Sequence, residues 1–424
     1  MNILFIVPYV PNLVRVRPYN LIRSLARRGN NITLATLISE ESEVVDIEKL
    51  RPHCRQILSM WMPKLHSVFN LCAALPTSRP LQASYSWQPA FARQIARHID
   101  QTTGKQAYDV IHVEHLRGAP YGISLKRSDA NPPVVWDSVD CISHLFQQAS
   151  LKSKKNLSRW GTRFELGRTR KYESWLARQF DAVMVTSSVD RDAFLALPGS
   201  ENQVRPIRVL PNGVDLDTFK PGNSHRDPAT LVVSGKMSYH ANITMTLFLV
   251  KEVMPLIWSR RPDVRVIVAG KNPSREILAL ADNPRIQVTG TVQDISSFMQ
   301  KSTVAVAPIQ YGAGIQNKVL EAMATATPVI TTAQGISALT VQPGRDLLVA
   351  GDAVDFAEKV LFLLNHPEEQ LRIGQSGREY VGTHYQWNQV AAQLEEIYQE
   401  VNDSEKNVAY RWVKKLSPSI TTLE

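Results

Sequence analysis

The segment YGAGIQNKVLEAMAT combines a glycine-bearing loop with charged side chains on the helical pattern that follows it. Gly312 and Gly314 come directly after the apolar run VAVAPI, and the helical pattern begins near Ile315. A helix that starts there presents free backbone N–H groups and a positive dipole end to an anion. Lys318 and Glu321 lie three residues apart and share one helix face. A cation for phosphate and a carboxylate for paired hydroxyls suit a nucleoside diphosphate, although an ordinary loop with a surface ion pair has the same pattern.

Another glycine, Gly235, ends the apolar run TLVVS and is followed at once by Lys236. Ligands of open α/β sheets bind beyond the carboxyl ends of the strands, so this lysine lies where a ligand is expected. The alternative is a solvated loop lysine. His240, in the same loop, is either a residue of the binding site or a surface histidine, and the sequence favours neither.

Polar side chains also end two apolar runs in the first half of the chain. In DVIHVEH, the two-residue repeat of a strand puts His112 and Glu114 on one side and His115 on the other. VVWDSVD places Asp137 at the end of a further strand, where it would orient a hydroxyl group. A buried histidine in a strand is more often a core residue than a catalyst, and Asp-Ser after a strand is also an ordinary helix entry.

The loop VPNLVRVRP, after the first apolar run, carries an amide and two cations: Asn12, Arg15 and Arg17. Guanidinium groups bind phosphate through paired N–H donors. This loop is therefore a third candidate for anion binding.

The elements that would position these residues are apolar runs that alternate with helical patterns. The first half contains NILFIVPY, NITLATL, DVIHVEH, PPVVWDSVD and FDAVMVTS, and the second contains TLVVSG, VRVIVAG, IQVTG, VAVAPI and PVITT. Such strands, alternating with helices, are typical of a parallel sheet covered on both faces. The chain of 424 residues exceeds one comfortable core, and its pattern restarts after a break near residues 205–228. We therefore predict an α/β protein with two Rossmann-like domains whose parallel sheets face across a cleft, the expected active site.

The segment around GAGIQNKVLEAMA, the lysine after TLVVSG and the junction segment LPNGVDLDTFKP together resemble the retaining glycosyltransferases of the group 1 superfamily (family 4), which have the GT-B fold. The exopolysaccharide-type branch is the most similar. The resemblance extends from Met1 to about residue 400, and its motifs are more specific in the second half. It implies an acceptor-side domain over residues 1–206, a nucleotide-sugar domain over residues 207–385, and a helix with a loose tail over residues 386–424 that crosses back toward the first domain.

The same resemblance implies a hexosyltransferase-type reaction. A sugar would pass with retention from a nucleoside diphosphate sugar, with UDP favoured over GDP, to a hydroxyl of a glycan or lipid-linked saccharide. The nucleotide sugar is a substrate, so neither a cofactor nor a metal ion is expected. The tripeptide at residues 215–217 formally matches the Asp-x-Asp pattern of metal-dependent transferases, but it belongs to the junction segment.

In the second half, the resemblance gives Glu321 the role of a ribose anchor. The glutamate that relatives carry eight residues earlier falls on Ala313, so backbone groups would hold the sugar or phosphate there. Lys236 corresponds to a basic residue that stabilises the leaving diphosphate, whereas Asn242 stands where a second basic residue is usual. Lys318 is the expected substitute for that charge. The predicted donor-binding set is Gly235, Asn242, Thr291, Val292, Gly312, Ala313, Gly314, Ile315, Asn317, Lys318 and Glu321.

In the first half, a histidine that touches the donor sugar in relatives falls on Glu114, or on His115 with a shift of one residue. Both join Lys236 as catalytic candidates. The loop after the first strand lacks the family's glycines, so Arg15 and Arg17 would substitute with charge. Together with Asn12 and Asp137 they form the predicted acceptor side.

Charge and hydropathy limit the remaining possibilities. The formal net charge is +9, and eight basic residues against one acid lie between Lys152 and Lys171. Such a run is either a solvated helix face or a contact for anionic lipid or a phosphorylated acceptor. The sequence has no nucleic-acid-binding motif, no uninterrupted apolar stretch of about 20 residues that would span a membrane, and three scattered cysteines without metal-ligand spacing. These features favour a cytoplasmic protein that binds no nucleic acid and contacts the inner face of a membrane.

Two alternatives share the predicted fold. One is an epimerase that acts on a sugar nucleotide, and the other is a nucleotide or glycan binder that has lost catalysis. The alanine at position 313 makes the second conceivable, and product analysis without an acceptor separates the first from a transferase.

Overall fold

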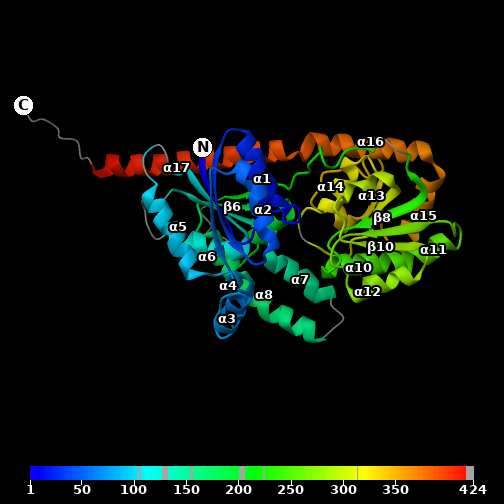
Figure 1. Cartoon of the computed structure of the whole chain (residues 1–424), viewed down its shortest axis with the longest axis horizontal. Helices are drawn as coiled ribbons and strands as arrows, with labels where there is room; N and C mark the ends of the chain where they lie inside the picture. The colour runs from blue at the N-terminus through cyan, green and yellow to red at the C-terminus, as the bar shows by residue number, and fades with distance from the viewer. Residues whose placement is uncertain are drawn as a thin grey trace, which may run out of the picture. The chain divides into compact units, whose positions relative to one another are not determined.

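The computed structural model describes residues 1–102, 104, 107–126, 132–152, 156–199, 206–222, 225–312 and 314–416. The chain forms two compact units (Figure 1). Unit 1 comprises Met1–Leu210 together with Val390–Glu424, and unit 2 comprises Pro211–Gln389. The sequence places the corresponding divisions after residues 206 and 385.

Unit 1 is built on a seven-stranded sheet in the order β3-β2-β1-β4-β5-β6-β7, and all neighbouring strands are parallel. Its five inner strands are buried almost throughout, as expected for a sheet covered on both faces, whereas the edge strands β3 and β7 are partly exposed. The strands are β1 (Asn2–Val7), β2 (Asn31–Ile38), β3 (Gln56–Trp61), β4 (Val110–Glu114), β5 (Val134–Val139), β6 (Ala182–Val185) and β7 (Ile207–Val209).

The helices of unit 1 bury one face against this sheet or against one another. They are α1 (Val16–Arg27), α2 (Ser42–Leu50), α3 (Lys64–Ala74), α4 (Leu81–Tyr85), α5 (Pro89–Gln101), α6 (His115–Leu125), α7 (Ile142–Lys152), α8 (Asn156–Ala177) and α9 (Ser188–Leu195). The last helix, α17 (Trp387–Leu416), belongs to unit 1 from Val390 onward. Its Tyr398 hydroxyl lies 2.8 Å from Nδ1 of His112 on β4, so the end of the chain completes the core of the first sheet.

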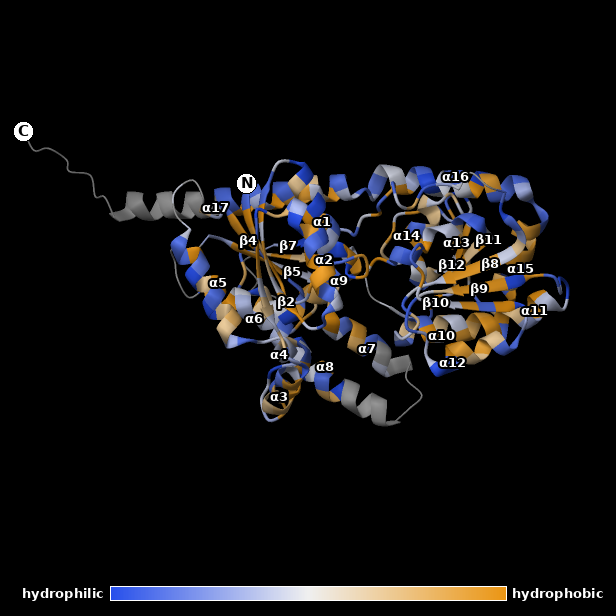
Figure 2. Ribbon diagram, viewed as in Figure 1, coloured by the Kyte–Doolittle hydropathy of each residue, from blue (hydrophilic) through white to orange (hydrophobic). Residues whose placement is uncertain are grey.

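Unit 2 contains a six-stranded parallel sheet in the order β10-β9-β8-β11-β12-β13. Figure 2 shows its strands as a hydrophobic layer, with helices of mixed hydropathy over it. The strands are β8 (Asp227–Ser234), β9 (Arg265–Ala269), β10 (Ile286–Gly290), β11 (Ser302–Ala307), β12 (Val329–Thr332) and β13 (Leu348–Ala350). The helices are α10 (His240–Phe248), α11 (Met254–Trp258), α12 (Arg275–Leu278), α13 (Ser296–Lys301), α14 (Asn317–Ala324), α15 (Ala353–Asn365) and α16 (Pro367–His384).

One helical stretch in the described part of the chain, His240–Trp258, is long and apolar enough to cross a membrane by length and composition alone. It runs from α10 through a π-helical turn into α11. Leu249, Val253 and Ile257 lie fully buried in the core of unit 2. A helix that covers a sheet has this composition, so the stretch is weak evidence for a membrane span.

Both sheets reverse their strand order at a central pair of strands, β1 and β4 in unit 1 and β8 and β11 in unit 2. Ligands of doubly wound sheets bind outside the carboxyl ends of the strands at this switch point. The prediction of two parallel Rossmann-like α/β domains is confirmed. Most of the residues singled out from the sequence follow these four strands.

Candidate functional site

The loops after β8 and β9 interlock through two glycines. Gly235 has φ +145° and Gly270 has φ +152°, and a Cβ atom on Gly270 would lie 1.7 Å from the carbonyl oxygen of Gly235. No residue with a side chain fits that contact, so both loops stay close to the strand ends. Gly270 was not singled out from the sequence, although a glycine at a strand end is the signal that identifies it.

Lys236 lies at the carboxyl end of β8 with an exposed side chain. It has no ion-pair partner in the described part of the chain, so its ammonium is available to an anion. The amide of Asn242 donates a hydrogen bond of 3.1 Å to the Lys236 carbonyl, and its side chain is buried. Asn242 therefore shapes the loop that carries Lys236 and adds no charge to it.

The loop after β11 is tied to the start of α10 by an aromatic contact. Nδ1 of His240 lies 2.7 Å from the Tyr311 hydroxyl, and the two rings are stacked with centroids 5.4 Å apart. The Gly312 carbonyl accepts a hydrogen bond of 3.0 Å from Gln334. Tyr311 was missed in the sequence because nothing in its own loop indicates a partner 71 residues away.

Helix α14 carries the residues predicted to anchor the donor. Gly314, with φ +66°, and Ile315 lead into it, whereas Ala313 lies outside the described residues. Oδ1 of Asn317, its first residue, accepts a hydrogen bond of 3.2 Å from Asn212 in the junction segment. Asn317 thus holds the turn of Asn212 and Gly213 against the start of the helix.

Lys318 and Glu321 lie half-buried on α14 without a direct ion pair between them. Burial lowers the pKa of Lys318 to about 8, which the charge of Glu321 partly opposes. Burial also raises the pKa of Glu321 to about 7, and the charge of Lys318 opposes that shift. The Lys318 ammonium donates 3.1 Å to Oε1 of Gln316, while the Glu321 carboxylate makes no hydrogen bond within the described residues. Hydroxyl donors from a ligand would stabilise its ionised form.

The predicted base-binding residues follow β10. Thr291 is exposed and Val292 half-buried, and the structure shows no side-chain contact that fixes either. Oδ1 of Asp294 accepts hydrogen bonds from the Ser296 amide and hydroxyl at 2.9 and 2.6 Å. Asp294 therefore stabilises the start of α13 through these hydrogen bonds.

In unit 1, two of the predicted acceptor-side residues pair with each other. Nε of Arg17 donates 2.7 Å to Oδ2 of Asp137, and Nη2 donates 3.1 Å to Oδ1. The Arg17 side chain is 4% exposed and that of Asp137 is fully buried. A buried bidentate pair of this kind positions its neighbours, and it leaves little of either charge for a ligand.

The other two predicted acceptor-side residues shape the loop after β1. Arg15 forms an ion pair of 2.7 Å with Glu43 and stacks over the ring of Tyr9. The amide of Asn12 donates 2.9 Å to Asp46, and its oxygen accepts the backbone N–H of Arg15. The loop without glycines is therefore held by side chains.

Glu114 lies at the carboxyl end of β4 and is 1% exposed. Its Oε1 accepts a hydrogen bond of 2.9 Å from the Tyr9 hydroxyl, and its Oε2 has no partner. Burial, followed by the charge of Asp137, raises its pKa to about 8. At neutral pH, Glu114 is therefore mostly protonated. Its Oε2, at the carboxyl end of β4, has no hydrogen-bond partner among the described residues.

His115 begins α6 in the left-handed region, with φ 63°. This conformation is rare for a residue with a side chain and is often found at functional positions. Burial lowers its pKa to about 3, and Nδ1 accepts the Arg117 N–H at 3.3 Å. The other histidine of this strand, His112, is fully buried beside Phe5 and Tyr398. The structure therefore places His112 in the core and both Glu114 and His115 at the strand end.

Arg117 was not singled out from the sequence. Its guanidinium stacks 4.8 Å over the ring of Tyr85, its Nε is buried without a partner, and no carboxylate pairs with it in the described residues. Burial lowers its pKa, and the charge of Arg15 lowers it further. Because Arg15 and Arg17 are both paired with carboxylates, Arg117 is better placed than they are to meet an anionic group. Only its position two residues after His115 would have suggested this.

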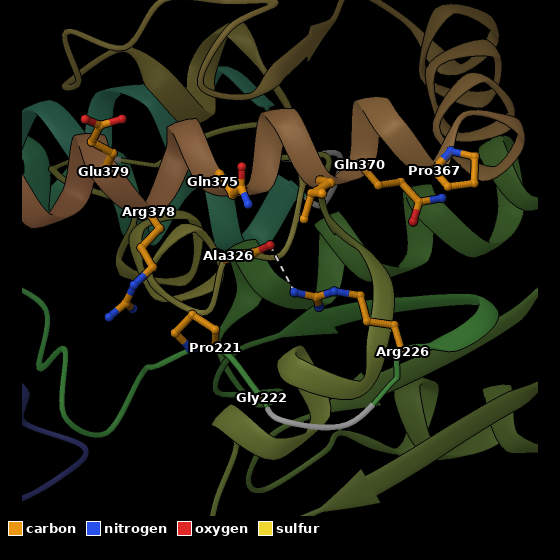
Figure 3. A pocket seen from close by; sticks show the side chains of 10 residues that line it. Pro221, Gly222, Arg226, Ala326, Pro367, Gln370, Gln375, Arg378 and Glu379 are labelled. Carbon is orange, nitrogen blue, oxygen red and sulfur yellow. Dashed lines mark hydrogen bonds between the residues drawn. The ribbon is translucent and has the colours of Figure 1, made fainter.

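A hollow of about 620 Å³ in unit 2 lies at the amino ends of its strands, away from the predicted donor residues (Figure 3). Arg226 projects into it and donates hydrogen bonds to the carbonyls of Ser302 at 2.9 Å and Ala326 at 2.9 Å. The guanidinium is occupied by the backbone, so we assign this arginine a structural role. The described residues also contain no group of three or more His, Cys, Asp or Glu side chains that would hold a metal ion.

Comparisons with known proteins agree with this arrangement. Residues 14–218 match the family model "Glycosyltransferase Family 4", and residues 228–366 match the model "Glycosyl transferases group 1". A GDP-mannose-dependent monoacylated alpha-(1-6)-phosphatidylinositol monomannoside mannosyltransferase from Corynebacterium glutamicum is 26% identical over 210 residues, which are 45% of this chain and 55% of that protein. The chain thus matches about half the length of this curated relative.

Two solved structures share the fold over nearly their whole length. Sucrose-phosphate synthase from Thermosynechococcus elongatus has a TM-score of 0.69 at 20% identity and covers 95% of this chain and 99% of its own. Anabaena HepE, in complex with UDP and glucose, has a TM-score of 0.67 at 14% identity and covers 94% and 99%. With both halves matched by glycosyltransferase models and both sheets by this fold, the chain belongs to the group 1, family 4 glycosyltransferases of GT-B architecture.

Proposed function

We propose that this protein is a hexosyltransferase that moves a sugar from a nucleoside diphosphate sugar to a hydroxyl of a glycan or lipid-linked saccharide, in polysaccharide or glycolipid biosynthesis. The observation that carries the proposal is the set of charged groups beyond β8 and β11. Lys236 is exposed and unpaired, and Lys318 and Glu321 lie half-buried without a mutual ion pair. Two cations and one carboxylate suit a diphosphate and a ribose diol.

The proposed donor is a UDP-sugar. Anabaena HepE, which shares the fold over 94% of this chain, binds UDP, and the mannosyltransferase relative uses GDP-mannose. The two relatives thus differ in the nucleotide that their names give. UDP and GDP are therefore the two donors to compare.

The proposed reaction retains the configuration of the anomeric carbon. The bond between that carbon and the diphosphate oxygen breaks while the acceptor oxygen forms its bond on the same face. The acceptor proton passes to the departing phosphate oxygen. Lys236 and Lys318 would stabilise the charge that develops on the diphosphate, and Glu321 would hold the ribose. Glu114 and His115 are the proposed contacts near the transferred sugar and the acceptor hydroxyl.

A ligand screen tests this proposal. A ligand that binds the native state raises the melting temperature, so we expect UDP or its sugars to stabilise the protein, with and without a chelator of divalent cations. Lys236→Ala should remove that shift and leave the melting temperature of the free protein unchanged, because the side chain is exposed. A matched control is Lys251→Ala, an exposed lysine on the turn that follows α10.

Product analysis then separates the alternatives. Transfer in the presence of an acceptor supports the proposal, a sugar isomer formed from the donor alone supports an epimerase, and nucleotide binding without turnover supports an inactive relative. Retention of full donor affinity by both Lys236→Ala and Glu321→Gln would contradict the assigned site.

We also propose a cytoplasmic location with peripheral membrane contact through the basic segment 152–171. The side chains of Arg163, Arg170 and Lys171 are the members available in the described part of this segment. Arg168 is buried in an ion pair of 2.8 Å with Glu165. Lys154 and Lys155 lie outside the described residues.

A further inference from the structure

Helix α3 in unit 1 has its apolar side chains on the outside. Leu65 is 84% exposed, Val68 54% and Phe69 69%. Cys72 is exposed as well, and Leu75, just beyond the helix, is 53% exposed. The spacing of three, four and seven residues puts all of them on one face. A helix of a water-soluble core normally turns this face inward.

The opposite face of α3 is fixed to the rest of unit 1 largely by polar contacts. The amide of Asn70 donates hydrogen bonds to the carbonyls of Tyr85 and Trp87 at 3.3 and 2.8 Å. Ser67 is buried on this side. At the end of the helix, the Arg168 guanidinium on α8 binds the carbonyls of Ala74 and Thr77. The outward orientation of the apolar face is therefore built into the fold.

Cationic side chains come from the two segments that meet at the C-terminal end of α3, where Arg168 of α8 binds it. Arg79, in the loop after α3, is exposed, and Arg163, Arg170 and Lys171 on α8 are exposed or half-buried. None of the four forms an ion pair within the described residues. The one acid of this part of α8, Glu165, is paired with Arg168 and accepts the Leu81 N–H at 2.9 Å. An apolar helix face flanked by cations is complementary to an anionic lipid surface.

We propose that α3 lies in the interfacial layer of an anionic membrane, with Leu65, Val68 and Phe69 among the acyl chains and the cations of α8 against the lipid phosphates. The 11 residues of α3 are too few to span a bilayer. The helix therefore lies in the membrane plane and brings unit 1 to the surface where a lipid-linked acceptor would be found. This inference rests on the proposed membrane contact and gives it an apolar anchor in addition to the basic segment.

Vesicle sedimentation of the full chain tests the proposal. We expect the wild-type protein to bind vesicles of phosphatidylcholine and phosphatidylglycerol, and to bind phosphatidylcholine alone more weakly. The double variant Leu65→Asp, Phe69→Asp should bind the anionic vesicles at least tenfold more weakly. The control Leu278→Asp, Leu371→Asp carries the same change of charge at leucines that are 51% and 62% exposed in unit 2, and it should bind like the wild type.

The native thiol on the same face gives a second measurement. Cys72 is exposed whereas Cys141 is buried, and Cys54→Ser removes the intermediate one. A polarity-sensitive fluorophore on Cys72 should shift to the blue when anionic vesicles are added, because the probe then enters an apolar layer.

Equal loss of binding in the control, or an unchanged fluorophore spectrum on bound protein, would overturn the proposal. So would light scattering that shows a dimer of the wild type and a monomer of the α3 variant, since the face would then join two copies of the chain. A UDP thermal shift measured on the same variants reports the donor site separately. Loss of vesicle binding in the α3 variant with an unchanged UDP thermal shift would bear on the role of α3 alone. Absence of any UDP thermal shift would count against the proposed sugar transfer.

Discussion

Glu114 and Asp137 stand directly opposite each other in the register of β4 and β5, yet only Asp137 has a cationic partner. Arg17 holds the aspartate through two hydrogen bonds, while Glu114 receives one from the Tyr9 hydroxyl. Two buried carboxyl groups at the same level of a sheet disfavour double ionisation. Burial and the charge of Asp137 therefore raise the pKa of Glu114 to about 8.

The raised pKa of Glu114 predicts a pH dependence of stability. The folded state binds more protons than the unfolded state between about pH 4.5 and pH 8, so this group makes the free energy of unfolding fall as pH rises through that interval. Glu114→Gln should remove this part of the slope and stabilise the protein most at pH 8, relative to wild type. Urea unfolding at several pH values measures it. Glu41→Gln, an exposed control, should leave the slope unchanged.

The ion pair of Arg17 and Asp137 predicts a large loss of stability when one partner is removed. Arg17→Met leaves an unpaired buried carboxylate and should lower the free energy of unfolding by about 3–5 kcal/mol. Arg51→Met breaks an exposed pair with Glu48 and should have little effect on the free energy of unfolding, because solvent screens that pair. The double variant Arg17→Met, Asp137→Asn provides the check. If its loss of free energy of unfolding in urea equalled the sum of the losses of the two single variants, the residues would not act as a pair.

The assignment of Glu321 predicts a defect in donor binding without a defect in folding. A hydrogen bond to a charged group contributes about 1.5–3 kcal/mol, so Glu321→Gln should weaken nucleotide binding by roughly 10- to 100-fold. Calorimetric titration with UDP measures this. Glu276→Gln, at an exposed site on α12, is the matched control. If Glu321→Gln and Glu276→Gln bound UDP with equal affinity, Glu321 would not belong to the donor site.

Lys318 predicts proton uptake when the donor binds. Its pKa is lowered to about 8, and a diphosphate nearby would raise it. Nucleotide affinity should therefore fall as pH rises through about 8, and binding at that pH should take up protons. Calorimetry in buffers of different ionisation enthalpy counts them. The uptake should disappear in Lys318→Met, and its persistence there would assign it to another group.

Arg117 predicts a selective effect on the acceptor side. Arg117→Ala removes a guanidinium that has no carboxylate partner, so the fold should be little affected, and the KM for an anionic acceptor should rise about tenfold or more. Donor hydrolysis without acceptor should be unchanged. Arg117→Lys should recover part of the loss, and Arg97→Ala, exposed on α5, should have none. An equal rise for a neutral acceptor would point to a steric role.

The sequence predicted the elements well because apolar strands in a parallel sheet leave a strong local pattern. Lys236 and Glu321 were located for the same reason, since each follows a recognisable strand. The partner of each arginine could not be predicted. Arg17 and Asp137 are 120 residues apart and meet only because β4 lies between β1 and β5.

The structure also gives several of the predicted ligand-binding groups partners within the protein. Asn12 and Arg15 were expected to face an acceptor, but both hold the loop after β1 through Asp46 and Glu43. Asn242 was expected to touch the donor, and its amide instead binds the Lys236 carbonyl. A polar side chain that is hydrogen-bonded within the protein and one that is free to bind a ligand can have the same local sequence. Only tertiary contacts distinguish them.

The contact between His112 and Tyr398 affects the order in which the two units can fold during synthesis on the ribosome. The two residues are separated by 286 positions, although both belong to the core of unit 1. At synthesis rates of about 5–20 residues per second, His112 is made roughly 15–60 s before Tyr398. During that interval unit 2 is made and can fold, so the domain that begins first is finished last.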